Sequence, residues 1–430
     1  MHRFHYQNDR LHCENIDLGS LATTHGTPLY VYSKGTITDH FTRLDAALAP
    51  LNHLVCYAVK ANSNLAVLST IAKLGGGFDI VSAGELFRVI KAGGDPSKCT
   101  FAGVGKTRDE IIYALNQGIY CFNAESEAEL RYIDRIAGEL GKKAPVAVRV
   151  NPNVDAKTHA KITTGKSENK FGIDFDQIID VYARIAAECP NLIIRGLQMH
   201  IGSQLTTVDP FVEAVQKVIP LVKTIQERHR IEFFSIGGGI GINYRQSLDS
   251  GPDTWWQQNA ETHPLTVQAY AQAVVPLLTP LGLRILCEPG RFMVGNAGVL
   301  LTSVLYEKRG SAKTFKIVDA GMNDLIRPTL YEGWHQIVPV QKPADAKTEL
   351  ADVVGPICES GDFLAQNREM APVQAGDVLA VMSAGAYGFT MASNYNTRPL
   401  PAEILVDGDK ATLVRERQSL DDVIRGEHTA

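Results

Sequence analysis

Short hydrophobic runs alternate with longer amphipathic segments over the first two thirds of the chain. The short runs are typical of buried strands, and the longer segments carry apolar residues at helical spacing. Strands are predicted at residues 53–60, 77–82, 99–105, 119–124, 144–152, 192–204, 231–241 and 283–291. Helices are predicted at residues 36–49, 64–76, 83–94, 108–118, 127–141, 175–190, 209–229 and 266–282.

This alternation indicates an α/β protein with a parallel sheet, either a closed (β/α)8 barrel (a TIM barrel) or an open doubly wound sheet. The count of eight strands favours the barrel. A long polar insert at residues 153–173 separates the fifth strand from its helix. We therefore predict that residues 35–285 form a (β/α)8 barrel.

Beyond residue 298 the pattern changes to short strands bounded by Gly, Asp and Pro, without strong helical spacing. The sequence "DGDK" at residues 407–410 is a hairpin-turn signal. Residues 28–35 also read as a strand, which we expect to join this later region. We predict a mostly antiparallel β-barrel domain formed by residues 1–34 and 286–430.

Composition excludes several classes of function. The 430 residues are 45% hydrophobic and 21% charged, as in an ordinary globular protein. The net charge of -5, without a long basic run, argues against nucleic acid or an anionic membrane as partner. No apolar run is long enough to span a bilayer, and the first residues lack the apolar core of a signal peptide. The seven scattered cysteines include no CxxC pair, so we expect reduced thiols, a cytoplasmic protein and no metal site.

The chemistry of a barrel of this kind lies where its strands run out into the βα loops. The predicted strand ends carry Lys60, Asp79, Arg149, Asn151, His200, Ser203, Gly237, Gly238, Gly239, Glu288, Gly290 and Arg291. Each has a simpler explanation alone: a lysine that reaches water, a flexible glycine turn, a structural histidine or a paired arginine. Their coincidence on one rim predicts a binding site.

One kind of ligand fits these residue types. Glycines after the seventh strand let backbone N–H groups approach an anion, and the loops after the last two strands commonly bind phosphate. His200 offers a flat ring for stacking, Glu288 a negative charge and Lys60 an amine. A planar phosphate ester with an aldehyde and a basic ring nitrogen satisfies all of them, and that ligand is pyridoxal 5'-phosphate (PLP).

The motifs "YAVKAN", "MHIGSQ", "GGGIG", "EPGR", "CESGD" and "AYG" follow one another in this order. The chain thereby resembles the barrel-type PLP-dependent amino-acid decarboxylases of alanine racemase-like fold, and among these the diaminopimelate decarboxylases. The insert "HAKITTGKSENKFGI" and the residues of the motif "CESGD" favour this family over the ornithine and arginine decarboxylases. The resemblance implies decarboxylation of meso-2,6-diaminopimelate to L-lysine and CO2, the last step of lysine biosynthesis, by a homodimer with active sites shared between subunits.

The resemblance also implies residue roles. Lys60 carries PLP as a Schiff base, Glu288 lies at the ring nitrogen, and Cys358 returns a proton to the substrate. Cofactor contacts are implied for Lys60, Asp79, Arg149, His200, Ser203, Gly237, Gly238, Gly239, Glu288, Pro289, Gly290, Arg291 and Tyr387. Substrate contacts are implied for Arg291, Arg327, Tyr331, Glu359 and Tyr387.

Other interpretations stay open at this point. A decarboxylase of the same fold could act on ornithine, arginine or a carboxynorspermidine-type substrate, but the two arginines and Glu359 suit a second amino-acid end. A non-catalytic PLP-binding regulator, or a Schiff-base aldolase without cofactor, would leave Glu288 or the phosphate loop without a role. Without the resemblance, Arg327 reads as a surface arginine and Cys358 as an inert buried thiol.

Overall fold

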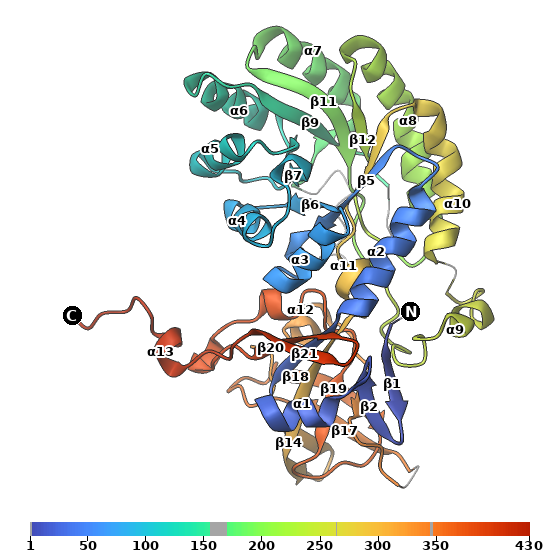
Figure 1. Cartoon of the computed structure of the whole chain (residues 1–430), viewed down its shortest axis with the longest axis vertical. Coiled ribbons are helices and arrows are strands. Elements are labelled where there is room, and N and C mark those ends of the chain that lie inside the picture. The colour runs from blue at the N-terminus through green and yellow to red at the C-terminus, as the bar shows by residue number, and fades with distance from the viewer. Residues whose placement is uncertain (1, 155–169, 264, 345–346) are drawn as a thin grey trace. The chain divides into compact units, whose positions relative to one another are not determined.

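The computed structural model describes residues 2–154, 170–263, 265–344 and 347–430 (Figure 1). The chain divides into two compact units. The barrel unit consists of Thr38–Gly241 and Asn259–Met293, and the sheet unit of Met1–Ile37, Ile242–Gln258 and Val294–Ala430. The domain limits expected from the sequence, at residues 35 and 285, stay a prediction.

Eight parallel strands form the barrel. They are β5 (His53–Ala58), β6 (Gly77–Ile80), β7 (Cys99–Phe101), β8 (Cys121–Ala124), β9 (Ala144–Asn151), β11 (Leu192–Met199), β12 (Phe233–Ser235) and β13 (Arg284–Cys287). Each strand pairs with the next, and β13 pairs with β5, so that the sheet closes on itself. A two-residue strand, β10 (Ile173–Asp174), adds to β9. This closure confirms the predicted barrel over the open sheet.

Helices surround these strands (Figure 1). They are α2 (Lys34–Leu48), α3 (Leu65–Lys73), α4 (Ala83–Lys91), α5 (Arg108–Gln117), α6 (Glu127–Glu139), α7 (Ile178–Glu188), α8 (Asp209–His229) and α10 (Val267–Leu278). Several begin where a short polar side chain caps free N–H groups. Ser82 and Ser126 cap α4 and α6, and Thr107 forms a capping box with Glu110 on α5.

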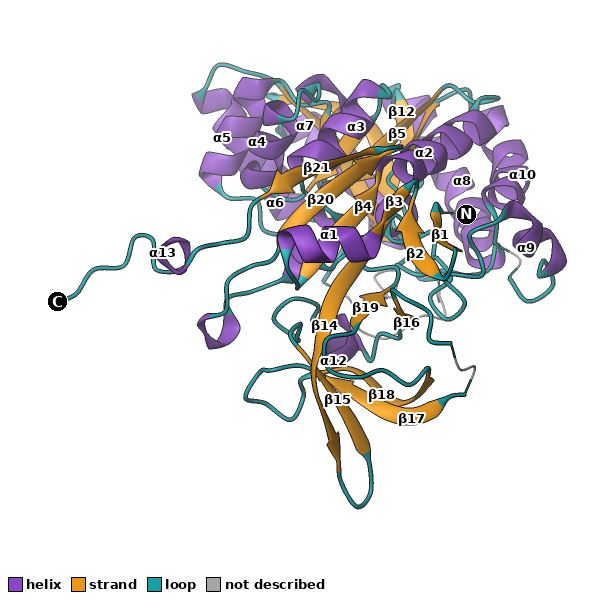
Figure 2. Ribbon diagram, turned by 60° about the horizontal axis from the view of Figure 1, so that its bottom comes forward, coloured by secondary structure: helices purple, strands orange, loops and turns teal. Residues whose placement is uncertain are grey.

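The sheet unit is built around a long strand, β14 (Gly298–Arg309), shown in Figure 2. The strand order is β18 (Phe363–Met370), β17 (Glu349–Val354), β15 (Thr314–Val318), β14, β4 (Leu29–Ser33), β20 (Ala402–Asp407) and β21 (Lys410–Arg415). A further pair, β16 (Ile337–Pro339) and β19 (Val378–Val381), joins through β14. In the described residues only the β15–β17 and β4–β20 pairings of this unit are parallel, which confirms a mostly antiparallel domain.

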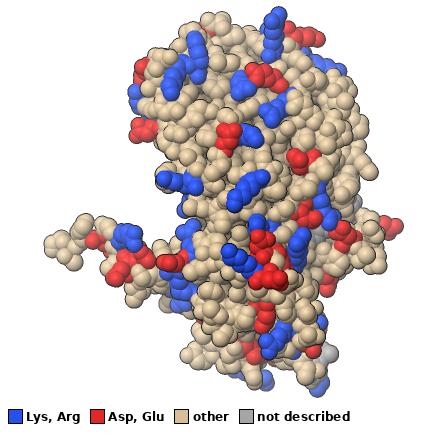
Figure 3. Space-filling model, in the orientation of Figure 1, with Lys and Arg blue, Asp and Glu red and all other residues tan. Residues whose placement is uncertain are grey.

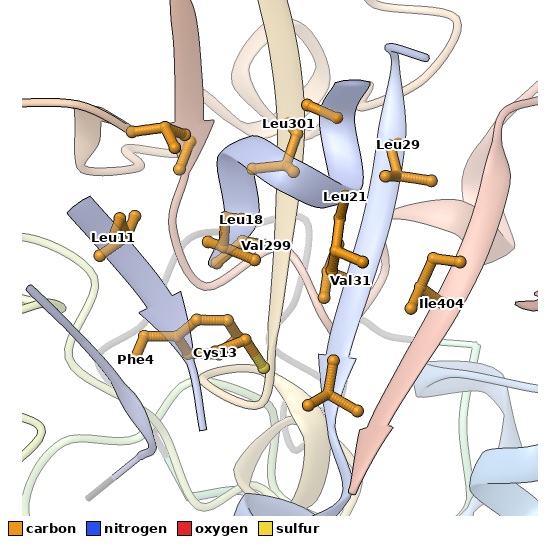
Figure 4. Close-up of a cluster of buried hydrophobic side chains, with 14 of the residues drawn as sticks. Phe4, Leu11, Cys13, Leu18, Leu21, Leu29, Val31, Val299, Leu301 and Ile404 are labelled. Atoms are coloured by element: carbon orange, nitrogen blue, oxygen red, sulfur yellow. The ribbon is translucent and has the colours of Figure 1, made fainter. Parts of the chain in front are cut away.

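Segments far apart in sequence share one core in this unit (Figure 4). Leu29 and Val31 of β4 pack with Val299 and Leu301 of β14 and with Ile404 of β20. Four elements near the N-terminus cover part of this core, and the sequence pattern did not predict them because they are short. They are β1 (Phe4–Gln7), β2 (Arg10–Cys13), β3 (Ile16–Asp17) and α1 (Leu18–His25). The sequence pattern also missed α9 (Asp253–Gln258), α11 (Arg291–Val294), α12 (Arg327–Tyr331) and α13 (Leu420–Val423).

Two surface properties agree with the composition. On the face drawn in Figure 3, acidic and basic side chains are interspersed rather than gathered into a field of one sign. Among the described residues, no helix has the length and apolar character needed to cross a bilayer.

Candidate active site

Lys60, predicted as the last residue of the first barrel strand, lies just beyond the end of that strand. Strand β5 ends at Ala58, and Lys60 belongs to a 3-10 turn, Val59–Ala61. Its Nζ lies 2.9 Å from Oδ2 of Asp79, whose side chain is only 3% exposed, whereas the lysine side chain is 42% exposed. Thr100, the neighbour of Asp79 in register, donates its hydroxyl to Oδ1 at 3.5 Å. A buried carboxylate thus holds the lysine amine at the carboxyl end of the barrel.

Glu288 follows β13 and is held by three donors. Ser235 Oγ lies 2.7 Å from Oε1 and Gln198 Nε2 lies 2.9 Å from Oε2. Asn123 Nδ2 approaches Oε1 at 3.4 Å. Burial raises the pKa of Glu288 to about 7, aided by the charge of Asp79 and opposed by the Ser235 and Gln198 hydrogen bonds. A cation placed beside this carboxyl group would favour its ionised form.

The sequence pattern did not single out the residues that hold Glu288. Gln198 and Ser235 are neighbours in register on β11 and β12, so both side chains point to the same side of the sheet. Asn123 is a buried amide within the apolar strand β8. Buried polar residues are normally hydrogen-bonded, so a polar residue near the end of an apolar strand was the available signal.

Arg149 is anchored by an acid that the sequence pattern also missed. Its Nη1 donates to Glu125 Oε1 at 2.8 Å, and both side chains are buried. The other oxygen of Glu125 accepts the Gly172 N–H at 2.8 Å. The guanidinium carbon lies 4.8 Å from the centre of the Phe171 ring. Arg149 Nη2 is buried without a hydrogen-bond partner among the described residues, so it can donate to an oxygen of a bound anion.

His200 comes directly after β11 and presents a neutral ring. The Gly238 N–H donates to its Nδ1 at 3.2 Å, so the ring hydrogen resides on Nε2. Burial lowers its pKa well below 6.5, helped by the positive charges of Arg149 and Lys60. A flat, uncharged ring at this position suits stacking on a planar ligand.

The three glycines after β12 form a backbone loop that admits no side chain. Gly237 and Gly239 have φ values of 70° and 111°, in the left-handed region that glycine favours. A Cβ at Gly238 would lie 2.1 Å from the carbonyl oxygen of Glu288, and one at Gly239 would lie 2.7 Å from that of Gly202. Gly237 and Gly238 are buried and Gly239 is partly exposed, so the close packing of the backbone requires glycine at these positions.

The loop after β13 completes this rim. The Pro289 carbonyl accepts the Ala58 N–H at 3.0 Å, which links the eighth strand end to the first. Gly290 accepts the Met293 N–H at 3.0 Å, and Arg291 donates through Nη2 to Ser203 Oγ at 3.2 Å. The structure thus brings together the site residues that the sequence placed in the barrel. An amine, a buried carboxyl, a neutral ring, a buried donor and a glycine cradle fit PLP chemically.

The predicted substrate residues Arg327 and Tyr331 lie in the sheet unit. Arg327 is 6% exposed, so its interpretation as a surface arginine was wrong. It begins α12, and its Nη1 lies 2.6 Å from His335 Nε2. Tyr331 ends the same helix and is half-buried, as is Tyr387, which adopts a φ of 55°.

Cys358 and Glu359 lie on an exposed turn of the sheet unit. Of the seven free cysteines, Cys358 is exposed and the other six are buried, so its interpretation as a buried thiol was wrong. Asp362 holds the turn by accepting the Ile357 N–H at 2.6 Å. Glu359 accepts the hydroxyl of Tyr395 at 3.0 Å.

Two further expectations concern a metal site and the polar insert. Among the described residues, no group of three or more His, Cys, Asp or Glu side chains is arranged to hold a metal ion. Most of the insert "HAKITTGKSENKFGI", which supported the resemblance, lies outside the described residues.

Comparison with known proteins agrees with this site. Residues 34–295 match the family described as pyridoxal-dependent decarboxylase, pyridoxal binding domain. The chain is 49% identical to a diaminopimelate decarboxylase of Vibrio cholerae, over 98% of this chain and 97% of the relative. It is also 49% identical to one of Pseudomonas aeruginosa, over 99% of both chains.

Solved structures give the same result. A diaminopimelate decarboxylase of Helicobacter pylori complexed with L-lysine has a TM-score of 0.87 and 40% identity, over 95% of this chain and 98% of that one. One from M. jannaschii, in co-complex with L-lysine, has a TM-score of 0.89 and 35% identity, over 99% and 98%. With the lysine, the buried carboxyl and the glycine cradle on one barrel rim, the chain belongs to the diaminopimelate decarboxylase family of PLP-dependent enzymes.

Proposed function

We propose that this chain converts meso-2,6-diaminopimelate to L-lysine and CO2, the last step of lysine biosynthesis. The observation that carries the proposal is the placement of Lys60, Asp79 and Glu288 at one end of the barrel. Near full-length similarity to diaminopimelate decarboxylases supports the choice of substrate.

The barrel residues hold the cofactor in this proposal. Lys60 binds PLP through its amine, His200 stacks on the ring, and the Gly237–Gly239 loop receives the phosphate together with Gly290. Ser203, Arg291 and Pro289 shape the rim, and Asp79 and Arg149 support the lysine and the ring substituents. When bound, PLP supplies an electron sink for the electron pair released as CO2 departs.

Glu288 has the task of keeping a ring nitrogen protonated. Its pKa of about 7 shows that burial disfavours its charge, and a cationic partner offsets that cost. The donors Ser235 and Gln198 fix both oxygens, so the carboxylate does not have to reorient when charge develops. A carboxylate fixed in this way lowers mainly the free energy of the transition state.

The sheet unit supplies the residues for the far end of the substrate. That end is itself an amino acid, with a carboxylate that suits the guanidinium group of Arg327 and an ammonium that suits Glu359. Tyr331 and Tyr387 border it. Simple diamine or guanidine tails would leave Arg327 without an anion, which disfavours ornithine and arginine as substrates.

Cys358 donates the proton that replaces the lost carboxylate, and it does so from a partner subunit. Its exposure on a turn, beside the exposed Glu359, supports a homodimer whose active sites are shared. The seven free cysteines also support a reducing, cytoplasmic location.

One assay tests this function against its rivals. CO2 release is measured with added PLP on meso-diaminopimelate, ornithine, arginine and lysine. Release from meso-diaminopimelate alone is expected. Equal release from ornithine or arginine would overturn the substrate. Visible PLP absorbance without release from any substrate would instead indicate a regulatory PLP-binding protein.

A further inference from the structure

The proton position on His335, a residue outside the predicted site, is fixed by its two partners. His335 is 0% exposed, its Nδ1 lies 2.8 Å from the Met382 carbonyl oxygen, and its Nε2 lies 2.6 Å from Nη1 of Arg327. A carbonyl cannot donate and a guanidinium cannot accept. Nδ1 therefore carries the hydrogen, and the Nε2 lone pair accepts from Arg327. His335 makes both bonds only as a neutral ring.

Tyr244 restricts Arg327 in a second direction. The guanidinium carbon lies 4.6 Å from the centre of the Tyr244 ring, which suits a cation over an aromatic face. The Tyr244 and His335 rings meet edge to face, with centres 5.2 Å apart and planes 78° apart. The Nε2 lone pair of His335 and the face of the Tyr244 ring both restrain the orientation of the guanidinium.

The backbone of His335 is fixed as well. Its carbonyl oxygen accepts a hydrogen bond from Arg368 Nη1 at 2.6 Å, and the Arg368 guanidinium lies 3.9 Å from the centre of the Trp334 ring. Arg245 lies near the same ring, at 5.6 Å. The histidine is therefore held through its main chain and through both ring nitrogens.

We propose that His335 is a positioning residue that selects the substrate through Arg327. It orients the guanidinium toward the distal carboxylate. Because the acceptor is neutral, it orients the arginine without neutralising the charge that the substrate needs. This inference rests on the proposed function, which assigns Arg327 to that carboxylate.

Two variants separate hydrogen bonding from packing. His335→Phe keeps a ring against Tyr244 but removes the lone pair, whereas His335→Gln offers an amide that can both accept and donate. His335→Phe is expected to raise KM for meso-diaminopimelate on the order of 10- to 100-fold with little change in kcat, as for loss of a hydrogen bond to a charged group. His335→Gln should recover most of the affinity. Competitive inhibition by L-lysine, which keeps one amino-acid end, should weaken in parallel with KM.

A double-mutant cycle with Arg327→Ala tests whether His335 affects substrate binding through Arg327. If His335 acts through Arg327, adding His335→Phe to Arg327→Ala produces no further rise in KM. Additive effects, or a fall in kcat and thermal stability with KM unchanged, would overturn the inference. If Arg327→Ala alone weakens binding but His335→Phe does not, only the inference fails. If Arg327→Ala has no effect on KM, the proposed distal contact fails with it.

Discussion

The amine of Lys60 and the carboxylate of Asp79 lie 2.9 Å apart and join the ends of the neighbouring strands β5 and β6. The ion pair joins the partly exposed side chain of Lys60 to the buried side chain of Asp79, so the lysine is tethered without being fully enclosed. An ammonium cannot attack a carbonyl group, and Asp79 is the carboxylate directly hydrogen-bonded to it.

Lys60→Ala is expected to abolish turnover and the visible absorbance of lysine-bound PLP, because the substitution removes the amine that binds the aldehyde. Lys60→Arg is the matched control, since it keeps the charge beside Asp79 but cannot form the imine. Absorbance spectra and CO2 release measure both. A Lys60→Ala protein that kept the band and near-normal turnover would exclude Lys60 from this role.

Glu288→Gln is expected to lower kcat on the order of 100-fold or more while changing PLP affinity little. The amide keeps the shape and the Ser235 contact but cannot hold a cationic ring nitrogen, and the loss is felt mainly as charge develops. Single-turnover kinetics and PLP titration of the cofactor-free protein separate the two effects. Unchanged kcat would show that another group protonates the ring.

The same substitution is expected to change how stability depends on pH in the cofactor-free protein. The folded-state pKa of Glu288 is raised from 4.5 to about 7, so between these values the folded chain holds a proton that the unfolded chain releases. Its stabilising contribution is complete below about pH 4.5 and is lost as pH rises through about 7. The stability advantage over Glu288→Gln should fall by on the order of 3 kcal/mol across this window.

Far-UV circular dichroism during urea unfolding suits this measurement, because most of the helices belong to the barrel unit. The tryptophans do not report on it, since Trp255, Trp256 and Trp334 all belong to the sheet unit. If the free energy of unfolding changed with pH in the same way in both proteins, the raised pKa of Glu288 would be contradicted.

Arg327→Ala is expected to raise KM for meso-diaminopimelate strongly and to reduce discrimination against substrates without a distal carboxylate. A site built for a charged group loses most when that group finds no partner. Competition between meso-diaminopimelate and ornithine provides the ranking. An unchanged ranking would place Arg327 outside the substrate pocket.

Mixing two inactive variants tests whether sites are shared between subunits. Lys60→Ala and Cys358→Ala chains are combined in equal amounts and allowed to re-form dimers. Random pairing makes half the dimers mixed, each with one site assembled from intact parts, so activity should return to about a quarter of wild type. The Cys358→Ala homodimer must itself show low activity.

Native mass spectrometry provides the control by counting mixed dimers. Mixed dimers without recovered activity would mean that Cys358 serves the lysine of its own chain or has a structural role.

The barrel could be predicted from the sequence because its evidence is local. Each strand carries its own apolar run and each helix its own spacing and cap, as Thr107 and Glu110 do for α5. Lys60 shows the limit of such reasoning: the apolar run continues to Val59, but the strand ends at Ala58 because the chain turns there.

The partners of the site residues could not be predicted in this way. Glu125 meets Arg149, and Gln198 meets Glu288, only after their strands have assembled into the sheet, because these contacts join residues 24 and 90 positions apart in sequence. Without the resemblance, Arg327 was taken for a surface arginine for the same reason, since its burial depends on tertiary neighbours such as His335.

Strand β4 ends at Ser33, yet one neighbour, β14, begins at Gly298 and the other, β20, at Ala402. A ribosome adding roughly 5 to 20 residues per second needs on the order of tens of seconds to make the first of these neighbours. During that interval, the apolar side chains Leu29 and Val31 have no sheet to join, because the ribosome is making the barrel unit, which ends only at Met293. We therefore expect the newly made β4 segment to need protection from aggregation, and slowing synthesis before residue 298 should increase aggregation through it.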